Sequence, residues 1–302
     1  MASGANPVKA ILFALGANFA IAAAKYIAAW FTNSGSMLAE AVHSTADCGN
    51  QLLLLLGLRA AKRPPTPDFP LGYGKSTYFW SFIVALMLFS VGGLFSVYEG
   101  WHKLHSPEPL SYPLLALGVL AFGIAAESFS TWGALREVNK ERGARSLWQW
   151  FRTSRNAELL VILGEDLAAL FGLALAFAAV TVTWITGNPL WDALGSIGIG
   201  VLLIVVAVLV GVEVKQMLIG QGVERELHQE MVDTLQAQPG VEKVLNLLTM
   251  QMGPDVMVAV KAKMKPAGSE AALLEAINRA EAAFRGKFPQ VAFLFFEPDF
   301  AN

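Results

Sequence analysis

The sequence predicts an α-helical polytopic membrane protein with six transmembrane helices, followed by a cytoplasmic α+β domain of αββαβ order with a ferredoxin-like fold. Three observations lead to this fold class. The chain is 55% apolar and 15% charged, with a mean hydropathy of +0.49, unlike an ordinary soluble domain. Six long apolar windows fill most of residues 1–220, the predicted membrane domain. A mixed helix and strand pattern then fills residues 221–302, the predicted second domain.

Each apolar window is long enough to cross a bilayer, because about 20 residues at a rise of about 1.5 Å span its hydrocarbon core. The windows cover residues 8–31, 36–58, 77–101, 112–135, 157–185 and 190–218. The first window has one lysine, Lys9, before its apolar run and lacks an obvious cleavage site, so we expect it to be retained as a helix.

Basic residues are distributed unevenly among the connections. They are frequent after the second window, from Arg59 to Lys75, and after the fourth, from Arg136 to Arg155, whereas the opposite connections hold one lysine between them. By the positive-inside rule, both termini are expected in the cytoplasm. The expected host is a bacterial cytoplasmic (inner) membrane.

Charge and cysteine content exclude two classes of protein. The net charge is −2 and the basic residues form no single tract, so we expect no nucleic-acid partner. Cys48 is the only cysteine, which excludes an intrachain disulfide and a cysteine-rich metal cluster.

The C-terminal tail reads as two helices and three strands. Helical periodicity in "VERELHQEMVDTLQAQPG" is followed by strand-like alternation in "VEKVLNLLTMQMG" and "DVMVAVKAKMK". An amphipathic helix, "SEAALLEAINRAEAAFRGKF", and a last strand, "QVAFLFFEP", complete the order. Domains of this size are marginal alone and often gain stability by pairing.

A polar stripe interrupts the second window. Glu40, His43, Asp47, Asn50 and Gln51 are spaced so that they share one helical face. Ionisable groups at membrane depth are costly and usually mark ion or proton sites inside a bundle. The four-residue spacing of His43 and Asp47 lets an imidazole and a carboxylate reach one divalent cation. The alternative is a structural role, in which the histidine bonds a neighbour and the amides join helices.

The fifth window contains the adjacent acids Glu165 and Asp166. Their depth from one membrane face matches that of Asp47 from the other, at about 14–15 Å, close to the bilayer midplane. Adjacent residues point about 100° apart on a helix, so one acid is expected to bind the cation and the other to support it or carry a proton. The alternative is that one of them pairs with Lys25 of the first window.

Two further acids in the windows need an explanation. Glu127 lies deep in the fourth window, where a role in a cation or proton pathway and a pairing with Lys25 both remain open. Asp192 begins the sixth window and is interpreted as a helix N-terminal charge in preference to an entrance group.

The segments "AEAVHSTADCGNQ", "PLGYGKSTYFWSF" and "GGLFSVYEGWHKL" resemble the cation diffusion facilitator family of zinc and related metal transporters, in particular the branch that includes the mitochondrial-type zinc transporters. The resemblance covers nearly the whole chain. It implies that His43 and Asp47, in "HSTAD", form the family's HxxxD ligand pair, and that the tail is the family's cytoplasmic dimerisation domain, which makes the protein a homodimer.

Two departures from the family pattern change the expectations. In the family, the fifth helix normally carries a second ligand pair, in which a histidine or aspartate precedes an aspartate by four residues. Here the residues four positions before Glu165 and Asp166 are the apolar Val161 and Ile162. We expect the two acids to replace the pair jointly, which gives an oxygen-rich site open to manganese, cobalt or ferrous iron as well as zinc. Asp166 is expected to be the directly bound acid, because the "LAALFG" that follows it fits the family pattern, and a histidine at Ile162 is expected to complete the usual pair beside it. The tail holds only one histidine, so metal-dependent regulation through the tail is not expected.

The sequence therefore predicts a transporter and not an enzyme: a divalent metal exporter, with zinc as the first candidate, working by proton antiport and alternating access. Expected partners are the cation, protons, membrane lipid and a second copy of the chain; no cofactor is expected. Histidine suits proton competition because its reference pKa of about 6.5 lies near physiological pH. Two alternatives remain, a non-transporting membrane interaction protein on the same fold and an exporter of small organic cations.

Overall fold

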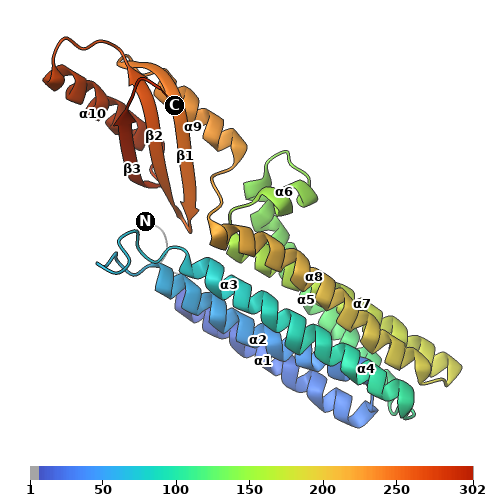
Figure 1. The fold of residues 1–302 in the computed structure, drawn as a ribbon. Coiled ribbons are helices and arrows are strands. Elements are labelled where there is room, and N and C mark those ends of the chain that lie inside the picture. Colours follow the sequence, from blue (N-terminus) through green and yellow to red (C-terminus); the bar gives the residue numbers. More distant parts are fainter. Residues whose placement is uncertain (1–6, 302) are drawn as a thin grey trace. The chain divides into compact units, whose positions relative to one another are not determined.

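The structure, a computed structural model, describes residues 7–301 (Figure 1). The chain divides into two compact units. Within the described residues, the helical unit comprises the chain up to Leu56, Trp80–Trp150 and Glu158–Val214, and the tail unit comprises Gly57–Phe79, Phe151–Ala157 and the chain from Lys215 onward. Two connections between helices therefore pack with the C-terminal tail, whereas the sequence placed the domain boundary near Gly220 alone.

The helical unit consists of long helices whose axes run alongside one another (Figure 1). They are α1 (Pro7–Thr32), α2 (Gly35–Ala61), α3 (Ser76–Met87), η1 (Leu88–Leu94), α4 (Phe95–His105), α5 (Pro113–Arg142), α7 (Ala157–Thr186) and α8 (Leu190–Ile219). The π-helical η1 joins α3 and α4 into one continuous 30-residue helix. These helices lie at the six predicted windows; the π-helical segment was not predicted.

Four helices in the described part of the chain are long and apolar enough to cross a membrane: Ser76–His105, Pro113–Arg142, Ala157–Thr186 and Leu190–Ile219. α1 and α2 are also long, at 26 and 27 residues, but α2 carries the polar stripe. Large apolar side chains point outward from α5, where Phe122 and Phe129 are 65% and 74% exposed. Such a surface is stable only against lipid or another protein, so the helical unit is an integral membrane structure.

Six helical segments contribute to one apolar core. Its members include Ala28 of α1, Ala39 of α2, Leu88 of η1, Leu120 of α5, Leu173 of α7 and Leu203 of α8. Glycines let two helices approach closely: a Cβ at Gly93 would lie 2.6 Å from Ile204, and one at Gly200 would lie 2.6 Å from the Val97 nitrogen. Small residues at helix contacts are the usual means of close packing inside a membrane.

The first turn of α2 is capped by a carboxylate from another helix. Asp192, at the start of α8, is 3% exposed and accepts hydrogen bonds from Ser34 Oγ at 2.7 Å, Gly35 N at 2.6 Å and Ser36 N at 3.3 Å. The first N–H groups of a helix lack partners within the helix and favour a negative charge. Asp192 is thus a helix N-terminal charge as predicted, but the helix that it caps is α2.

The tail consists of α9 (Arg225–Gln236), β1 (Val241–Met252), β2 (Asp255–Met264), α10 (Glu270–Lys287) and β3 (Val291–Pro298), which is the predicted αββαβ order. The sheet order is β1-β2-β3, with β1 and β2 antiparallel and β2 and β3 parallel. Alternate residues of β2, from Val256 to Ala262, are buried in a core shared with Met231, Leu235 and Phe284 of the helices. The closer likeness to a ferredoxin-like fold stays a prediction.

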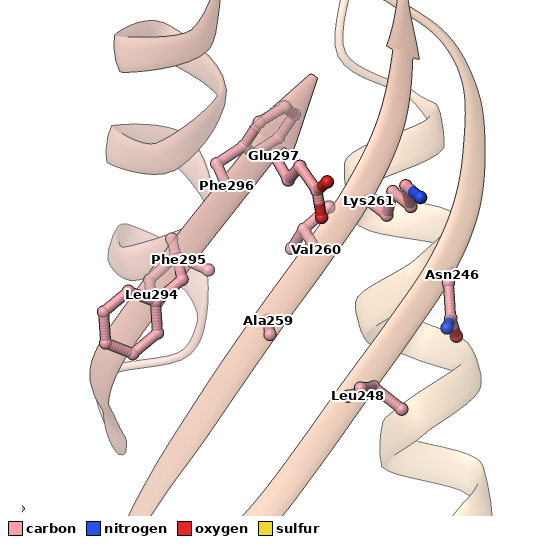
Figure 2. A pocket seen from close by; sticks show the side chains of 9 residues that line it. All are labelled: Asn246, Leu248, Ala259, Val260, Lys261, Leu294, Phe295, Phe296 and Glu297. Carbon is pink, nitrogen blue, oxygen red and sulfur yellow. The ribbon is translucent and has the colours of Figure 1, made fainter. Parts of the chain in front are cut away.

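The other face of this sheet holds a shallow pocket (Figure 2). In the strand register, Leu248 of β1 lies opposite Ala259 of β2, and Ala259 lies opposite Phe295 of β3. Leu248 and Phe295 are 61% and 56% exposed. An apolar row therefore crosses all three strands on the face away from the helical core.

The connection from α2 to α3 packs against the turn between β1 and β2, both within the tail unit. The Tyr78 hydroxyl accepts a hydrogen bond from Gly253 N at 2.9 Å. Gly74 is so close that a Cβ there would lie 2.1 Å from the Met252 carbonyl oxygen. The connection after α5 forms α6 (Leu147–Thr153), a short helix that was not predicted, and Arg155 beyond it donates to the Gly222 carbonyl at 2.7 Å.

Candidate metal site

The polar stripe of α2 faces the interior of the helical unit. Glu40, His43 and Asn50 are fully buried, and the side chain of Asp47 is 17% exposed. The helical spacing brings His43 Nδ1 to 3.7 Å from Asp47 Oδ1. This distance is too long for a hydrogen bond but leaves both groups directed toward a shared region, as two ligands of one cation require.

Several polar atoms of this stripe are buried without a hydrogen-bond partner among the described residues. They are both ring nitrogens of His43, Asp47 Oδ1, Asn50 Oδ1, Gln51 Oε1 and Glu40 Oε1. Buried polar atoms are normally paired, because an unpaired one costs about 1–3 kcal/mol. Their concentration on one helical face indicates a place where a cation or water supplies the missing contacts.

Glu165 of α7 lies against this stripe. Its carboxylate is buried at 9% exposure and accepts a hydrogen bond from Asn50 Nδ2, with Glu165 Oε1 as the acceptor. The bond joins α2 to α7 one turn beyond Asp47, because Asn50 follows Asp47 by three residues. Asn50 therefore positions an acid of α7 beside the His43 and Asp47 pair.

Asp166 points to a different neighbour. Its Oδ2 accepts a hydrogen bond from Ser130 Oγ of α5 at 3.1 Å, and its main-chain oxygen lies 3.4 Å from Thr131 Oγ1. Ser130 is exposed and Asp166 is partly exposed, in contrast to the buried Glu165. The two acids thus diverge as adjacent helical residues must, with Glu165 toward α2 and Asp166 toward the seam with α5.

Lys25 of α1 pairs with neither acid of α7. Lys25 Nζ lies 3.1 Å from Glu40 Oε2 and donates to Ser44 Oγ at 2.7 Å. The expected alternative pairing of Lys25 with Glu127 is not formed either, because Lys25 pairs with Glu40. Glu127 lies partly buried on α5. The pathway role of Glu127 stays a prediction, whereas Glu40 belongs to an ion pair beside the site.

The π-helical segment η1 covers His43 from another side. Gly92 of η1 faces the imidazole, since a Cβ at this position would lie 3.8 Å from His43 Nδ1. π-helical turns often occur at functional sites. The segment therefore forms a further wall of the site, next to α2 and α7.

The four predicted ligands are not gathered into a finished cluster. Within residues 7–301, no three histidine, cysteine, aspartate or glutamate side chains converge as a metal would require. The structure brings His43 to Asp47 and Glu165 to Asn50, and it leaves Asp166 at the seam with α5. The assignment of all four as ligands stays a prediction.

Sequence reasoning missed the partners of these groups. The Lys25 to Glu40 pair could have been suspected because Lys25 is a cation in the middle of an apolar window, but its choice of acid depends on packing. The contact of Ser130 with Asp166 had no signal in the sequence. In the tail, His228 Nε2 lies 3.0 Å from the Leu247 carbonyl oxygen, which gives this histidine a structural contact.

The fold and the buried polar stripe define a class: integral membrane proteins that handle a cation inside a helical bundle. The family defined by the cation efflux transmembrane domain matches residues 11–219, more than half of the chain. The chain therefore belongs to the cation efflux, or cation diffusion facilitator, family, whose members are transporters and not enzymes.

Curated relatives support this membership. The mitochondrial proton-coupled zinc antiporter SLC30A9 of Xenopus laevis is 34% identical over 253 residues, covering 82% of this chain and 45% of the relative. Metal tolerance protein C4 of Arabidopsis thaliana is 29% identical, covering 82% and 54% of the two chains. The cation-efflux pump FieF of Escherichia coli O1:K1 is 27% identical, covering 88% and 83%. The chain spans about half the length of the antiporters that it matches.

Proposed function

We propose that the protein exports a divalent metal cation, with zinc as the first candidate, in exchange for protons. The observation that carries this proposal is the set of unpartnered polar atoms on α2, from His43 to Gln51, facing Glu165 of α7. The names of the SLC30A9 relatives, which describe proton-coupled zinc antiporters, agree with such a role. Manganese, cobalt and ferrous iron remain possible cargo because the site is rich in oxygen ligands.

His43 and Asp47 provide the first two contacts to the cation. Glu165 is favoured as the third ligand, because it is buried and held beside the stripe by Asn50. Asp166 then supports the site from the seam with α5 or carries a proton. A rotation of α7 that breaks the bond from Asn50 to Glu165 would let the carboxylate turn from the amide to the ion, so the separation in the structure fits a site that closes around its cargo.

Protons compete with the metal for the same groups. A cation binds to carboxylates and to neutral imidazole, so protonated acids and imidazolium at the site must lose a proton when the metal binds. Alternating access then couples the two flows: the cation binds from the cytoplasm, and protons from the other side displace it after the helices rock. His43, Asp47 and Glu165 are the groups at which this exchange is proposed to take place.

The proposed topology has six membrane spans, with α1 and α2 added to the four strongly apolar helices. A polar helix such as α2 is tolerated in a bilayer when its ionisable groups face the bundle interior. The basic connections support cytoplasmic termini. We propose a bacterial inner membrane as the host; imaging of a tagged protein in its own cell decides this point, because the relatives include a bacterial pump and mitochondrial antiporters.

A second copy of the chain is the proposed partner of the open sheet face in the tail (Figure 2). The exposed apolar row from Leu248 to Phe295 would be covered by its counterpart, as small domains gain stability by pairing. Leu248→Glu should weaken dimerisation, whereas Leu274→Glu, an equally exposed leucine of α10, should not. Sedimentation of the full chain measures this, and equal dimer strength in both variants would contradict the proposal.

Transport itself is tested by reconstitution. Purified protein in sealed vesicles should drive zinc uptake when a proton gradient of the opposite direction is imposed, and uptake should collapse when a protonophore removes the gradient. The same vesicles assayed with manganese, cobalt and ferrous iron rank the cargo. Absence of flux for all four metals would favour a non-transporting protein, and uptake of organic cations alone would favour the third alternative.

A further inference from the structure

Lys25 and Glu40 form an ion pair buried inside the membrane domain, on the same helical face as the proposed ligands. The two side chains are 1% and 0% exposed, and Lys25 also contacts Ser44, the residue next to His43. A buried ion pair is often no more stable than well-packed apolar residues of the same size. Stability alone therefore gives a weak reason for this pair.

Glu40 is placed to become a metal ligand. It precedes His43 by three residues, which puts their Cβ atoms about 5–6 Å apart on one face of the helix. One of its oxygens, Oε2, is held by Lys25, while Oε1 has no hydrogen-bond partner among the described residues. A glutamate in this position and without Lys25 would be within reach of a cation held by His43.

Glycines of two neighbouring helices leave room for the Lys25 and Glu40 side chains. A Cβ at Gly172 of α7 would lie 2.6 Å from Glu40 Oε1, so only glycine leaves space for this carboxylate. A Cβ at Gly123 of α5 would lie 3.7 Å from Lys25 Cε. The carboxylate is thus directed toward α7 and Lys25 and is held in that position by packing and by charge.

We propose that Lys25 is a specificity-determining residue, which selects the metal by keeping the Glu40 carboxylate away from the cation. The proposal rests on the proposed metal transport through His43 and Asp47. With Lys25 in place, the imidazole remains a large share of the ligand set, which suits zinc. Without it, Glu40 adds one more oxygen ligand, and oxygen ligands favour manganese.

The experiment is a metal-dependent thermal denaturation of the full chain in detergent, with wild type, Lys25→Met, Lys25→Met/Glu40→Gln and Gly172→Ala. Each is titrated with Mn²⁺ and with Zn²⁺. Methionine keeps the length of Lys25 without its charge. Lys25→Met should raise the apparent Mn²⁺ affinity about 10-fold relative to Zn²⁺, a magnitude typical of changes next to a metal's ligands. The double variant should return the preference to that of wild type.

Gly172→Ala provides a test that removes no charge, because the new methyl group must displace the Glu40 carboxylate. It should shift the preference toward Mn²⁺ in the same direction and by less. Should Lys25→Met fold only with Mn²⁺ present, the freed carboxylate has been captured by the ion, as proposed. Should Lys25→Met fold neither with nor without Mn²⁺, the metal preference of Gly172→Ala tests the proposal in its place.

An unchanged Mn²⁺ to Zn²⁺ preference in Lys25→Met, or in Gly172→Ala where that variant decides, overturns the proposal. So does a shift that persists in the double variant, because the effect would then not pass through Glu40. Failure of the underlying metal site at His43 and Asp47 looks different: Zn²⁺ would then stabilise wild type no more than it stabilises His43→Ala.

Discussion

Asp192 offers the sharpest test of how the site helix is held in place. The Asp192→Ala substitution removes the acceptor of three hydrogen bonds from the first turn of α2, given by Ser34, Gly35 and Ser36. The carboxylate is 3% exposed, so water cannot easily replace it. The substitution therefore leaves buried donors without partners at a helix N-terminus.

The magnitude follows from these contacts. Hydrogen bonds to a charged group contribute about 1.5–3 kcal/mol, and loss of a helix cap costs about 1 kcal/mol. The bond from Ser36 N is long at 3.3 Å and the three share one carboxylate, so we expect a sum well below three full bonds. A loss of about 3–5 kcal/mol corresponds to a midpoint lower by about 10 °C for a unit of this size.

The assay is thermal unfolding of the purified protein, followed by tryptophan fluorescence. Asp192→Asn should lose about half as much as the alanine variant, because the amide keeps one acceptor oxygen. Glu137→Gln is the control: it breaks an exposed pair with Lys140, which contributes about 0–1 kcal/mol. The reasoning fails if Asp192→Ala unfolds within about 2 °C of wild type, which on the same scaling is less than about 1 kcal/mol.

Two other predictions test the helix phases and the tail. Val161→His should shift transport selectivity toward zinc, because Val161 is 1% exposed and lies one turn before Glu165. Ile162→His, at a position that is 38% exposed, should leave the selectivity unchanged. Uptake of zinc in competition with manganese into vesicles measures both. Gly74→Ala should speed hydrogen exchange at the Gly253 amide, because the new Cβ would clash with the Met252 carbonyl oxygen. Gly286→Ala is the control, since a Cβ there meets no atom within 4 Å, and it should leave this exchange rate unchanged. Equal exchange rates in the two variants would refute the close contact between Gly74 and the turn.

The sequence was sufficient for the elements and the α2 stripe, and the reason is local. Apolar length places the helices, and the spacing from Glu40 to Gln51 places those side chains on one face whatever surrounds them. The order of helices and strands in the tail followed from its alternating patterns in the same way. The π-helical turn, α6 and the packing of two connections with the tail had no such pattern.

Contacts between helices could not be read from the sequence. The adjacent acids of α7 had to diverge, but their packing against α2 and α5 decides that Glu165 meets Asn50 and that Asp166 meets Ser130. From the pattern alone, a histidine at Ile162 was expected to complete the site beside Asp166. The exposure of Ile162 and the burial of Val161 now favour the neighbouring position.

The most direct test of the central claim is zinc flux in vesicles for His43→Ala and Asp47→Ala, with His102→Ala as the control. His102 is an exposed histidine of α4, so its loss removes an imidazole without touching the stripe. All three variants should remain folded and of wild-type oligomeric state. We predict that zinc flux is lost in the first two and kept in the third. Flux at the wild-type rate in both His43→Ala and Asp47→Ala would contradict the account.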